Sequence, residues 1–265
     1  MNALHSLPGT GHHGTAITRA SDTEWHAVED DRVVGHGDAL LRPDGRLFIG
    51  IDAWHGAVFD RLAEAMAAAL PAPLYAVADE ADHDALAAWQ RAGFTTVRRE
   101  RVYAVPTDPE ITGLGPARPP AGVDILPVGR ADEAPLRDLD RVLHGEIEAG
   151  DGWWTMPARL MPCSPGTSVV DPSKYAVARQ GGRYVGLLRL APLTRRPRIG
   201  LIAVRSAEQR HGIARALLAD TLDALHRSGT TSVRAEVTET NAAATALFEG
   251  IGARCDGATL ELVRR

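Results

Sequence analysis

Cysteine and lysine are nearly missing from this sequence of 265 residues. Only two cysteines occur, Cys163 and Cys255, and they form neither a disulfide framework nor a zinc-binding spacing. We therefore expect two free thiols in a reducing cytoplasm and no metal site. Lys174 is the only lysine among 29 basic residues, and this arginine bias is typical of a GC-rich bacterial genome.

Long hydrophobic runs and an excess of positive charge are also absent. No apolar run approaches the roughly 20 residues that span a bilayer, so no membrane partner is expected. The net charge of −5 provides no basic field for nucleic acid. The glycine- and histidine-rich residues 1–15 do not resemble a signal peptide, and we expect a disordered tail there.

A segment rich in proline and glycine occupies residues 106–121. It has neither a strand nor a helix period, and proline cannot continue a helix or a central strand. We expect a semi-extended linker between a first domain, 16–105, and a second domain, 122–265.

The second domain alternates strand and helix patterns. Strands are predicted over 123–128, 175–179, 184–190, 199–204, 232–237 and 259–263, and helices over 131–147, 212–227 and 242–249. Gln180-Gly181-Gly182-Arg183 predicts a hairpin turn between the second and third strands. The order predicts an α/β fold with a mixed sheet and helices on both faces.

The first domain repeats the later part of that order. Strands are predicted over 25–28, 32–41, 47–51, 74–78 and 97–105, and helices over 57–70 and 83–91. We therefore predict two related α/β units in tandem, the first truncated because it lacks the opening strand and helices.

The segment 198–227 has the pattern of an anion-binding turn. A buried strand ends at Val204, and Gln209-x-x-Gly212-x-Ala214 opens an amphipathic helix. Small residues let a ligand approach the backbone, and the unpaired N–H groups of a first helical turn favour a pyrophosphate. Arg210 and Arg215 add positive charge there.

This pattern resembles the Q/R-x-x-G-x-G/A turn of the GCN5-related N-acetyltransferases, a resemblance that covers about residues 122–265. It implies that the turn binds the pyrophosphate of acetyl-CoA and that the preceding strand receives the pantetheine. The residues expected to bind the cofactor are Leu201, Ile202, Ala203, Val204, Gln209, Arg210, His211, Gly212, Ile213, Ala214 and Arg215.

A second segment, 237–253, is similar to the family's N-x-x-A-x-x-L-Y-x-x-x-G-F stretch. Asn241 is a natural helix N-cap, and the resemblance adds a contact with the cofactor. Leu247 and Phe248 complete the expected cofactor residues, although Leu247 also suits core packing. Phe248 stands where many relatives have a tyrosine that protonates the leaving thiolate, and phenylalanine has no acidic proton.

Acetyl transfer to an amine requires a proton acceptor near the splayed strands. Glu236 and Glu239, at the end of the strand predicted over 232–237, are candidates, and so is Glu146, near the end of the helix over 131–147.

The first domain resembles the same family only in part. Trp89 stands at the tyrosine position and Gly93-Phe94 matches the closing pair, but the Q/R-x-x-G-x-G/A spacing is missing before Gly56. Trp54 and Phe59 are typical of packing residues. We expect a degenerate unit that binds no cofactor.

The sequence thus predicts an acetyl-CoA-dependent N-acetyltransferase that acts by direct attack on a small-molecule or peptide amine, as a monomer or homodimer. Narrower alternatives are a mycothiol-synthase-like enzyme or an antibiotic acetyltransferase, whose cationic acceptor would suit the acidic residues of the segment Glu146–Asp151. The alternative from another class is a non-catalytic acyl-CoA-binding sensor or scaffold, which Phe248 favours.

Overall fold

The computed structural model describes residues 14–42, 44–115, 118–150, 170–191 and 197–265. It divides into two compact units. Unit 1 comprises Met1–Val77, Asp82–Thr95 and Leu262–Arg265, and unit 2 comprises Ala78–Ala81 and Thr96–Glu261. The predicted domains 16–105 and 122–265 are each continuous in sequence, whereas these units are not. Cys163 and most of the predicted tail lie outside the described residues.

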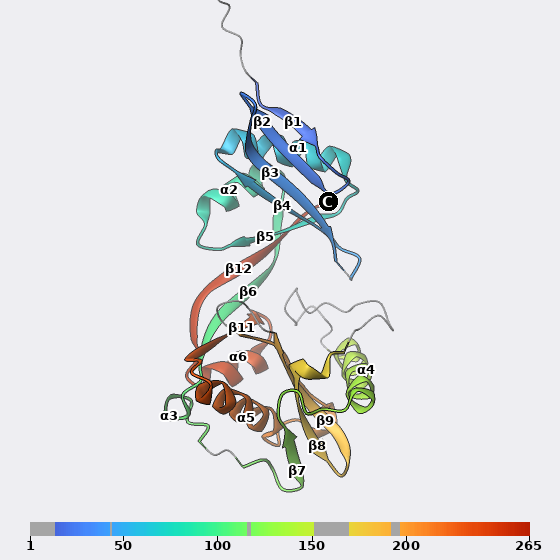
Figure 1. Cartoon of the computed structure of the whole chain (residues 1–265), viewed down its shortest axis with the longest axis vertical. Coiled ribbons are helices and arrows are strands. Elements are labelled where there is room, and N and C mark those ends of the chain that lie inside the picture. The colour runs from blue at the N-terminus through green and yellow to red at the C-terminus, as the bar shows by residue number, and fades with distance from the viewer. Residues whose placement is uncertain (1–13, 43, 116–117, 151–169, 192–196) are drawn as a thin grey trace, which may run out of the picture. The chain divides into compact units, whose positions relative to one another are not determined.

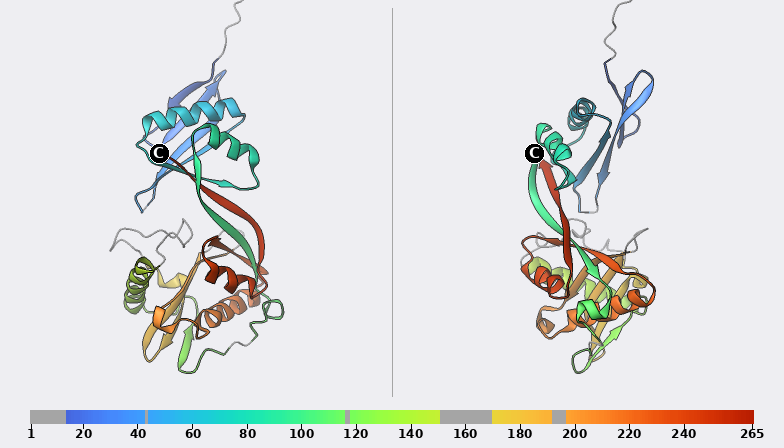
Figure 2. Two further views of the ribbon diagram at one scale, coloured as in Figure 1. Left: turned by 180° about the vertical axis from the view of Figure 1, so that it is seen from behind. Right: turned by 90° about the vertical axis from the view of Figure 1, so that its left-hand side faces the viewer.

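The described residues of unit 1 form five strands and two helices. Strands β1 (Ala16–Arg19), β2 (Glu24–Glu29), β3 (Arg32–Leu41), β4 (Leu47–Ala53) and β5 (Leu74–Asp79) are neighbours in that order. Helices α1 (Gly56–Ala69) and α2 (His83–Arg91) lie on one face of these strands (Figures 1 and 2). Every element predicted for this part of the chain is present, and β1 is an additional strand.

The core of unit 1 forms under α1 because its apolar residues recur with the helical period. Val58, Leu62 and Met66 are completely buried. The ring of Trp89 packs edge-on against Phe59, with ring centroids 4.9 Å apart. Phe59 is therefore a packing residue, as the sequence predicts.

Unit 2 contains the remaining strands in the order β12-β6-β11-β10-β9-β8-β7. Their bounds are β6 (Thr95–Pro106), β7 (Val123–Leu126), β8 (Tyr175–Gln180), β9 (Arg183–Ala191), β10 (Arg198–Val204), β11 (Ser232–Thr238) and β12 (Arg254–Arg264). The helices are α3 (Pro109–Thr112), α4 (Glu133–Ala149), α5 (Ile213–Arg227) and α6 (Ala242–Glu249), with 3-10 turns η3 (Pro172–Lys174) and η4 (Ser206–Glu208). These elements confirm the predicted mixed sheet.

Two hydrophobic clusters cover opposite faces of the unit 2 sheet. Leu217, Leu218 and Leu222 of α5 pack on one face together with Phe248 of α6. Leu136, Leu139 and Leu143 of α4 pack on the other face, and Figure 1 shows α4 and α5 on either side of β8 and β9. The sheet is covered on both sides, which explains the nearly continuous apolar runs of β8 and β9.

Glycines close the turns that the sequence predicts. Gly181 and Gly182 join β8 to β9 with φ of 55° and 79°, the left-handed pair that a two-residue hairpin requires. Gly229 follows α5 with φ of 86° and ends that helix.

The segment predicted as a linker is partly structured. Asp108 caps α3 by accepting a hydrogen bond from the Glu110 amide at 2.8 Å. Leu114 is only 6% exposed and belongs to the α5-side core. The proline-rich composition of this segment did not predict the short helix α3.

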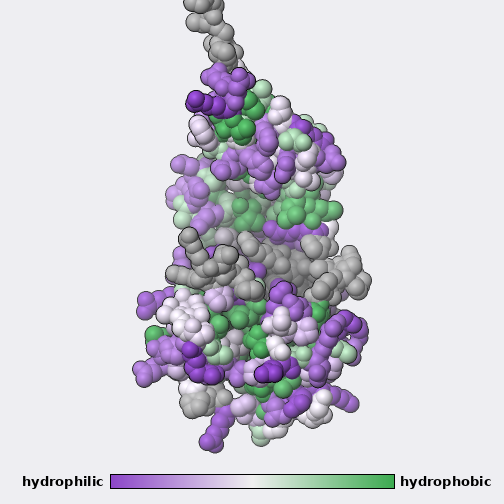
Figure 3. Space-filling model, in the orientation of Figure 1, coloured by the Kyte–Doolittle hydropathy of each residue, from purple (hydrophilic) through white to green (hydrophobic). Residues whose placement is uncertain are grey.

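The face of the molecule that Figure 3 shows has mixed polarity. Hydrophobic and hydrophilic residues alternate over short distances on the face that Figure 3 shows. Among the described residues, no helix is long and apolar enough to cross a membrane.

Asp220, in the middle of α5, provides a test of the packing of this helix. Burial raises the pKa of Asp220 and the charge of Asp223 raises it further, while Arg227 opposes both. A raised folded-state pKa means that ionisation costs stability above that pKa and nothing below the unfolded value of about 3.9. We expect Asp220→Asn to raise Tm by about 1–4 °C at pH 8 and to leave it unchanged at pH 3.

Thermal unfolding followed by circular dichroism at both pH values measures this difference. Asp138→Asn on the exposed face of α4 is the control, because its pair with Arg141 is fully at the surface. Equal Tm values for Asp220→Asn and wild type at pH 8 would refute the expected cost of burial.

Candidate functional site

The turn between β10 and α5 has a specific backbone path. The Arg205 amide donates to the Val185 carbonyl at 2.9 Å, which fixes the start of the turn on the neighbouring strand. The Gln209 side-chain amide donates to the Val204 carbonyl at 3.0 Å and folds the loop back on the end of β10. Gln209 therefore shapes the turn, a role that its first position in the motif did not specify.

Left-handed residues bring the chain into α5. Arg210 has φ of 64° and Gly212 has φ of 85°. Gly212 is the N-cap residue, and no side chain caps the helix. The first turn of α5 contains no acidic residue either.

The uncapped N-terminus of α5 leaves its first-turn amides available. The amides of Ile213, Ala214 and Arg215 precede the first intrahelical bond, which the Ala216 amide donates to the Gly212 carbonyl at 3.0 Å. The helix dipole adds partial positive charge at this point. Gly212, His211 and Arg210 are exposed, so an anion can reach these amides.

Strands β10 and β11 separate beside this turn. Their parallel pairing covers Arg198↔Arg234 and Ile199↔Ala235 only. A bulge at Gly200 shifts the register of β10 against β9 between Ile199 and Leu201. Residues 200–204 of β10 therefore have unpaired backbone groups on the side facing β11, within reach of an extended polar ligand.

Gly186 on β9 allows α5 to approach the sheet. A Cβ atom at this position would lie 3.2 Å from Ile213 Cγ2, 3.2 Å from Val204 Cγ2 and 3.3 Å from the Ala203 carbonyl. Ile213 is the first residue of α5 and is 2% exposed. Gly186 thus sets the position of the first turn relative to the end of β10.

We expect Gly186→Val to weaken acetyl-CoA binding about tenfold, because overpacking by the three carbon atoms of an isopropyl group displaces the first turn of α5 at a cost of about 1–3 kcal/mol. Titration calorimetry with acetyl-CoA measures the change. Gly145→Ala in α4, where a Cβ meets nothing within 4 Å, is the control and should bind normally. An unchanged Kd for Gly186→Val would show that this contact does not set the position of the turn.

Glu146, a predicted proton acceptor, holds the turn instead of standing free. Its Oε2 accepts hydrogen bonds from the Ser206 amide at 2.8 Å and from Ser206 Oγ at 3.0 Å. Its Oε1 lies 3.5 Å from Arg205 Nε. The carboxylate thus connects α4 to η4 and stabilises the loop before α5.

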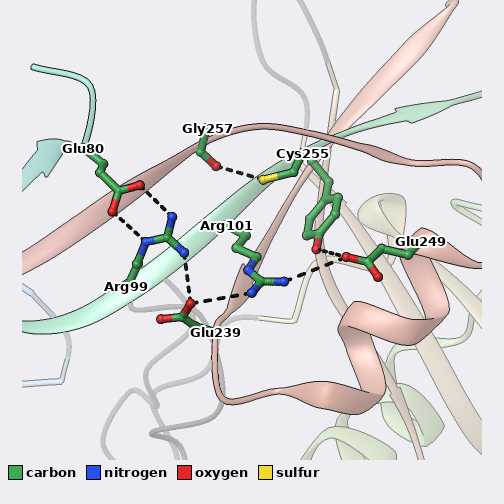
Figure 4. Close-up of polar contacts among 8 residues, drawn as sticks. Glu80, Arg99, Arg101, Glu239, Glu249, Cys255 and Gly257 are labelled. Atoms are coloured by element: carbon green, nitrogen blue, oxygen red, sulfur yellow. Dashed lines mark hydrogen bonds and ion pairs between the residues drawn. The ribbon is translucent and has the colours of Figure 1, made fainter.

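Glu239, the second predicted proton acceptor, belongs to an ion-pair network beyond the end of β11 (Figure 4). Its Oε1 lies 3.0 Å from Arg99 and 3.6 Å from Arg101, and its side chain is 48% exposed. Arg99 also forms a bidentate pair with Glu80 at 2.6 Å, and this hydrogen bonding lowers the pKa of Glu80. The network joins the end of β5, β6 and the loop after β11.

Glu236, the third predicted proton acceptor, is nearly buried, with a side chain 6% exposed. Arg198 donates to its Oε2 at 3.1 Å and Arg234 donates to its Oε1 at 3.1 Å. Glu236 is the first residue of β11 after its last pair with β10. Of the three candidate proton acceptors, Glu236 is the one that lies at the point where β10 and β11 separate.

Phe248 is a core residue. It is 3% exposed, and its ring stacks on Tyr103 of β6 with centroids 6.2 Å apart. The Tyr103 hydroxyl donates to Glu249 Oε1 at 3.0 Å, and burial raises the pKa of Tyr103. Sequence reasoning did not anticipate Tyr103, because nothing local indicates that β6 pairs with β11.

The remaining predicted cofactor residues of α6 have structural roles. Asn241 caps the helix by accepting a hydrogen bond from the Ala244 amide at 2.9 Å, which confirms the N-cap interpretation. Leu247 packs against the α5-side core, as expected. The contact of Asn241 with a cofactor stays a prediction.

The corresponding connection in unit 1 is much shorter. Only Trp54 and His55 separate β4 from α1. Trp54 is 76% exposed, so its assignment as a packing residue is wrong. Both residues of this connection, Trp54 and His55, are exposed.

Arg189 on β9 is the other residue that the sequence did not reveal. It lies in an otherwise apolar strand pattern, and it pairs with Tyr175 of β8 and Leu201 of β10. The sequence signal for this residue was an arginine inside a buried strand, which indicates a polar face next to the bulge of β10. In the described ranges, no group of three or more His, Cys, Asp or Glu side chains could hold a metal ion.

Comparison with known proteins identifies the domain that carries this site. Residues 151–253 match the model of the acetyltransferase (GNAT) family. The matched segment includes β8, β9, β10, α5, β11 and α6. It is a GNAT acetyltransferase domain, the domain of an acetyltransferase enzyme. No curated protein matches the chain in sequence.

Solved structures share the fold. A GCN5-related N-acetyltransferase from Sphaerobacter thermophilus is 18% identical with a TM-score of 0.63, over 93% of this chain and 82% of that chain. A tandem GNAT protein from the clavulanic acid biosynthesis pathway is 15% identical with a TM-score of 0.66, over 91% and 82%. A GCN5-related N-acetyltransferase from Kribbella flavida is 15% identical with a TM-score of 0.60, over 94% and 89%. These likenesses show the mixed-sheet acetyltransferase fold.

Proposed function

We propose, from the GNAT acetyltransferase domain at residues 151–253, that the chain transfers an acetyl group from acetyl-CoA to an amine by direct attack. The observation that carries this proposal is the uncapped N-terminus of α5, preceded by the left-handed Gly212 and placed after the splayed end of β10. The amides of a helix end without a side-chain cap are available to water or to a ligand, and a pyrophosphate provides acceptor oxygens and negative charge.

The expected binding residues divide into two sets. The amides of residues 210–215 would bind the pyrophosphate, and the backbone of Leu201, Ile202, Ala203 and Val204 would bind the pantetheine amides along the open edge of β10. Asn241 lies at the start of α6, where its side chain already serves the helix. Leu247 and Phe248 pack in the hydrophobic core on the α5 side of the sheet.

Glu236 is our proposed proton acceptor. The amine nitrogen attacks the thioester carbonyl carbon, the C–S bond breaks, and the proton of the amine moves to the carboxylate directly or through water. Phe248 has no proton to give, and the thiolate leaves as an anion. A thiol with a pKa of about 8.5 is a tolerable leaving group, so the reaction does not depend on an acid at this position.

We also propose the tandem arrangement, with residues 122–265 active and residues 16–105 a degenerate relative without a cofactor. Gly35 of β3 pairs with Ala53 at the end of β4, as Gly186 of β9 pairs with Val204 at the end of β10. A Cβ at Gly35 would lie 2.6 Å from Val58 of α1, the counterpart of the contact between Gly186 and Ile213. The same glycine under the same helix supports a duplication.

Titration calorimetry of the whole chain with acetyl-CoA tests the proposal. We expect micromolar binding with one acetyl-CoA per chain, since only two residues connect β4 to α1 in unit 1 and they cannot form a turn like the one before α5. No heat of binding at high micromolar cofactor would refute it, and two sites per chain would refute the degenerate first unit. Binding without acetylation of any amine in a broad panel would favour the sensor alternative.

A further inference from the structure

Four side chains form a polar patch on the face of the unit 2 sheet that α4 covers. They are Tyr175 of β8, Arg189 of β9, Arg198 of β10 and Glu236 of β11. Tyr175 and Leu201 belong to the core under α4, and Arg189 is the register partner of both. The neighbours of Glu236 on β11, Ala235 and Val237, face the opposite core, so Glu236 faces this side.

Arg189 lies against the bulge of β10. A Cβ atom on Gly200 would lie 3.2 Å from Arg189 Nε and 3.3 Å from its terminal nitrogen, so the guanidinium rests on the bare Cα of this glycine. Gly200 directly follows Ile199, the last residue of β10 that pairs with β11. The guanidinium is therefore at the point where the two strands separate.

The positive charge of this patch exceeds its negative charge. Both oxygens of Glu236 are already bonded, one by Arg198 and the other by Arg234. The Nε groups of Arg189 and Arg198 are buried without a hydrogen-bond acceptor among the described residues. The only group seen to interact with the Arg189 guanidinium there is the neutral phenol of Tyr175, whose pKa burial raises and Arg189 lowers.

Among the described residues, no acid of α4 forms an ion pair with Arg189. Asp140 lies 3.6 Å from His144 on the same helix and acts on Tyr175. Glu146 bonds to Ser206 and Arg205. A half-buried guanidinium without a carboxylate is costly, and a bound anion would offset that cost.

We propose that the acceptor is an amine that also carries a carboxylate, and that Arg189 binds this carboxylate beside Glu236. This inference rests on the proposed acetyl transfer and names its substrate class. The planar guanidinium suits a carboxylate in two-point contact. Glu236 then lies on the same face to receive the proton of the amine. A cationic acceptor is disfavoured, because Glu146 is engaged by the turn.

Matched pairs of amines test the proposal. Glycine, β-alanine and 4-aminobutyrate are compared with their primary amides, together with O-phosphoethanolamine and spermidine, and CoA release is followed with a thiol reagent. For at least one acid we expect kcat/KM to exceed that of its amide roughly 30-fold or more. The phosphate compound distinguishes a carboxylate site from a general anion site, and equal or faster turnover of it would overturn the carboxylate assignment.

Arg189→Gln is expected to remove the preference for the acid over the amide, mainly through KM, while the Kd for acetyl-CoA stays within about threefold. Arg189→Lys should restore only part of it, since an ammonium makes no two-point contact. Arg183→Gln, an exposed arginine at the start of the same strand, is the control and should keep the full preference.

Other outcomes separate this inference from the proposed function. Faster turnover of spermidine or of the amides by the wild-type chain overturns the carboxylate inference and leaves the acetyltransferase intact. Failure to bind acetyl-CoA overturns the proposed function itself. If acetyl-CoA binds and no amine reacts, the carboxylate inference is tested by binding instead. The affinities of N-acetylglycine and of its amide for the complex of the chain with CoA are compared, and equal affinities overturn the inference. This comparison uses the wild-type chain, so it holds even if Arg189→Gln does not fold.

Discussion

Replacing Gly212 by valine is expected to weaken acetyl-CoA binding by about 100-fold or more, the largest loss that one substitution at the turn should cause. Gly212 has φ of 85°, a conformation that a β-branched residue resists. The new side chain would also stand among the amides that approach the pyrophosphate. Loss of those charge-assisted hydrogen bonds, each worth about 1.5–3 kcal/mol, accounts for the size of the effect.

Gly229 at the other end of α5 provides a matched control. Its φ of 86° is nearly the same, and a Cβ there meets nothing within 4 Å. Gly229→Val should therefore lower the free energy of unfolding by a similar amount through backbone strain and leave the Kd for acetyl-CoA unchanged. Calorimetric Kd values with urea unfolding separate the two effects. Equal Kd values for both variants would contradict an anion site at Gly212.

Replacing Glu236 by glutamine is expected to lower kcat by a factor of about 10²–10³, with the Kd for acetyl-CoA within about threefold of wild type. The amide is nearly isosteric with the carboxylate and cannot accept the proton of the amine. An acceptor whose amine has a low pKa, and which is already neutral at the assay pH, should lose less. A merely structural role of Glu236 would slow all acceptors equally.

Glu239→Gln and Glu146→Gln are the comparisons for this variant. Glu239 is half exposed in a surface network, and we expect its removal to change kcat less than about threefold. Glu146→Gln should act on binding, since it weakens the bonds to Ser206 that hold the turn. A larger loss of kcat in Glu239→Gln than in Glu236→Gln would reassign the proton acceptor. Thermal unfolding confirms that each variant is folded.

Sequence patterns predicted the elements well because each pattern reflects a local cause. The apolar period of α5, the Gly181-Gly182 turn and the Asn241 cap act within a few residues, and the structure confirms them. The turn before α5 was recognisable for the same reason, since a glycine at the start of a helix has a local meaning, and its binding of an anion stays a proposal.

The rest of the candidate site depends on contacts between distant residues. The position of Arg189 against Gly200 requires the bulge of β10, which no residue pattern announced. The ring stack between Tyr103 and Phe248 requires β6 to pair with β11. Trp54 was misassigned because hydrophobicity alone does not decide burial in a two-residue connection.

The pairing of β6 also constrains how this gene can evolve. Tyr103 and Val105 of β6 belong to the core of unit 2, while Leu262 and Val263, at the end of β12, are buried residues of unit 1. A break anywhere in 106–121 would separate unit 1 from the end of β12 and separate unit 2 from β6. Recombination that exchanges one half for a homologous domain would produce two incomplete cores. The two halves must therefore be inherited and translated together, even if only one of them performs chemistry.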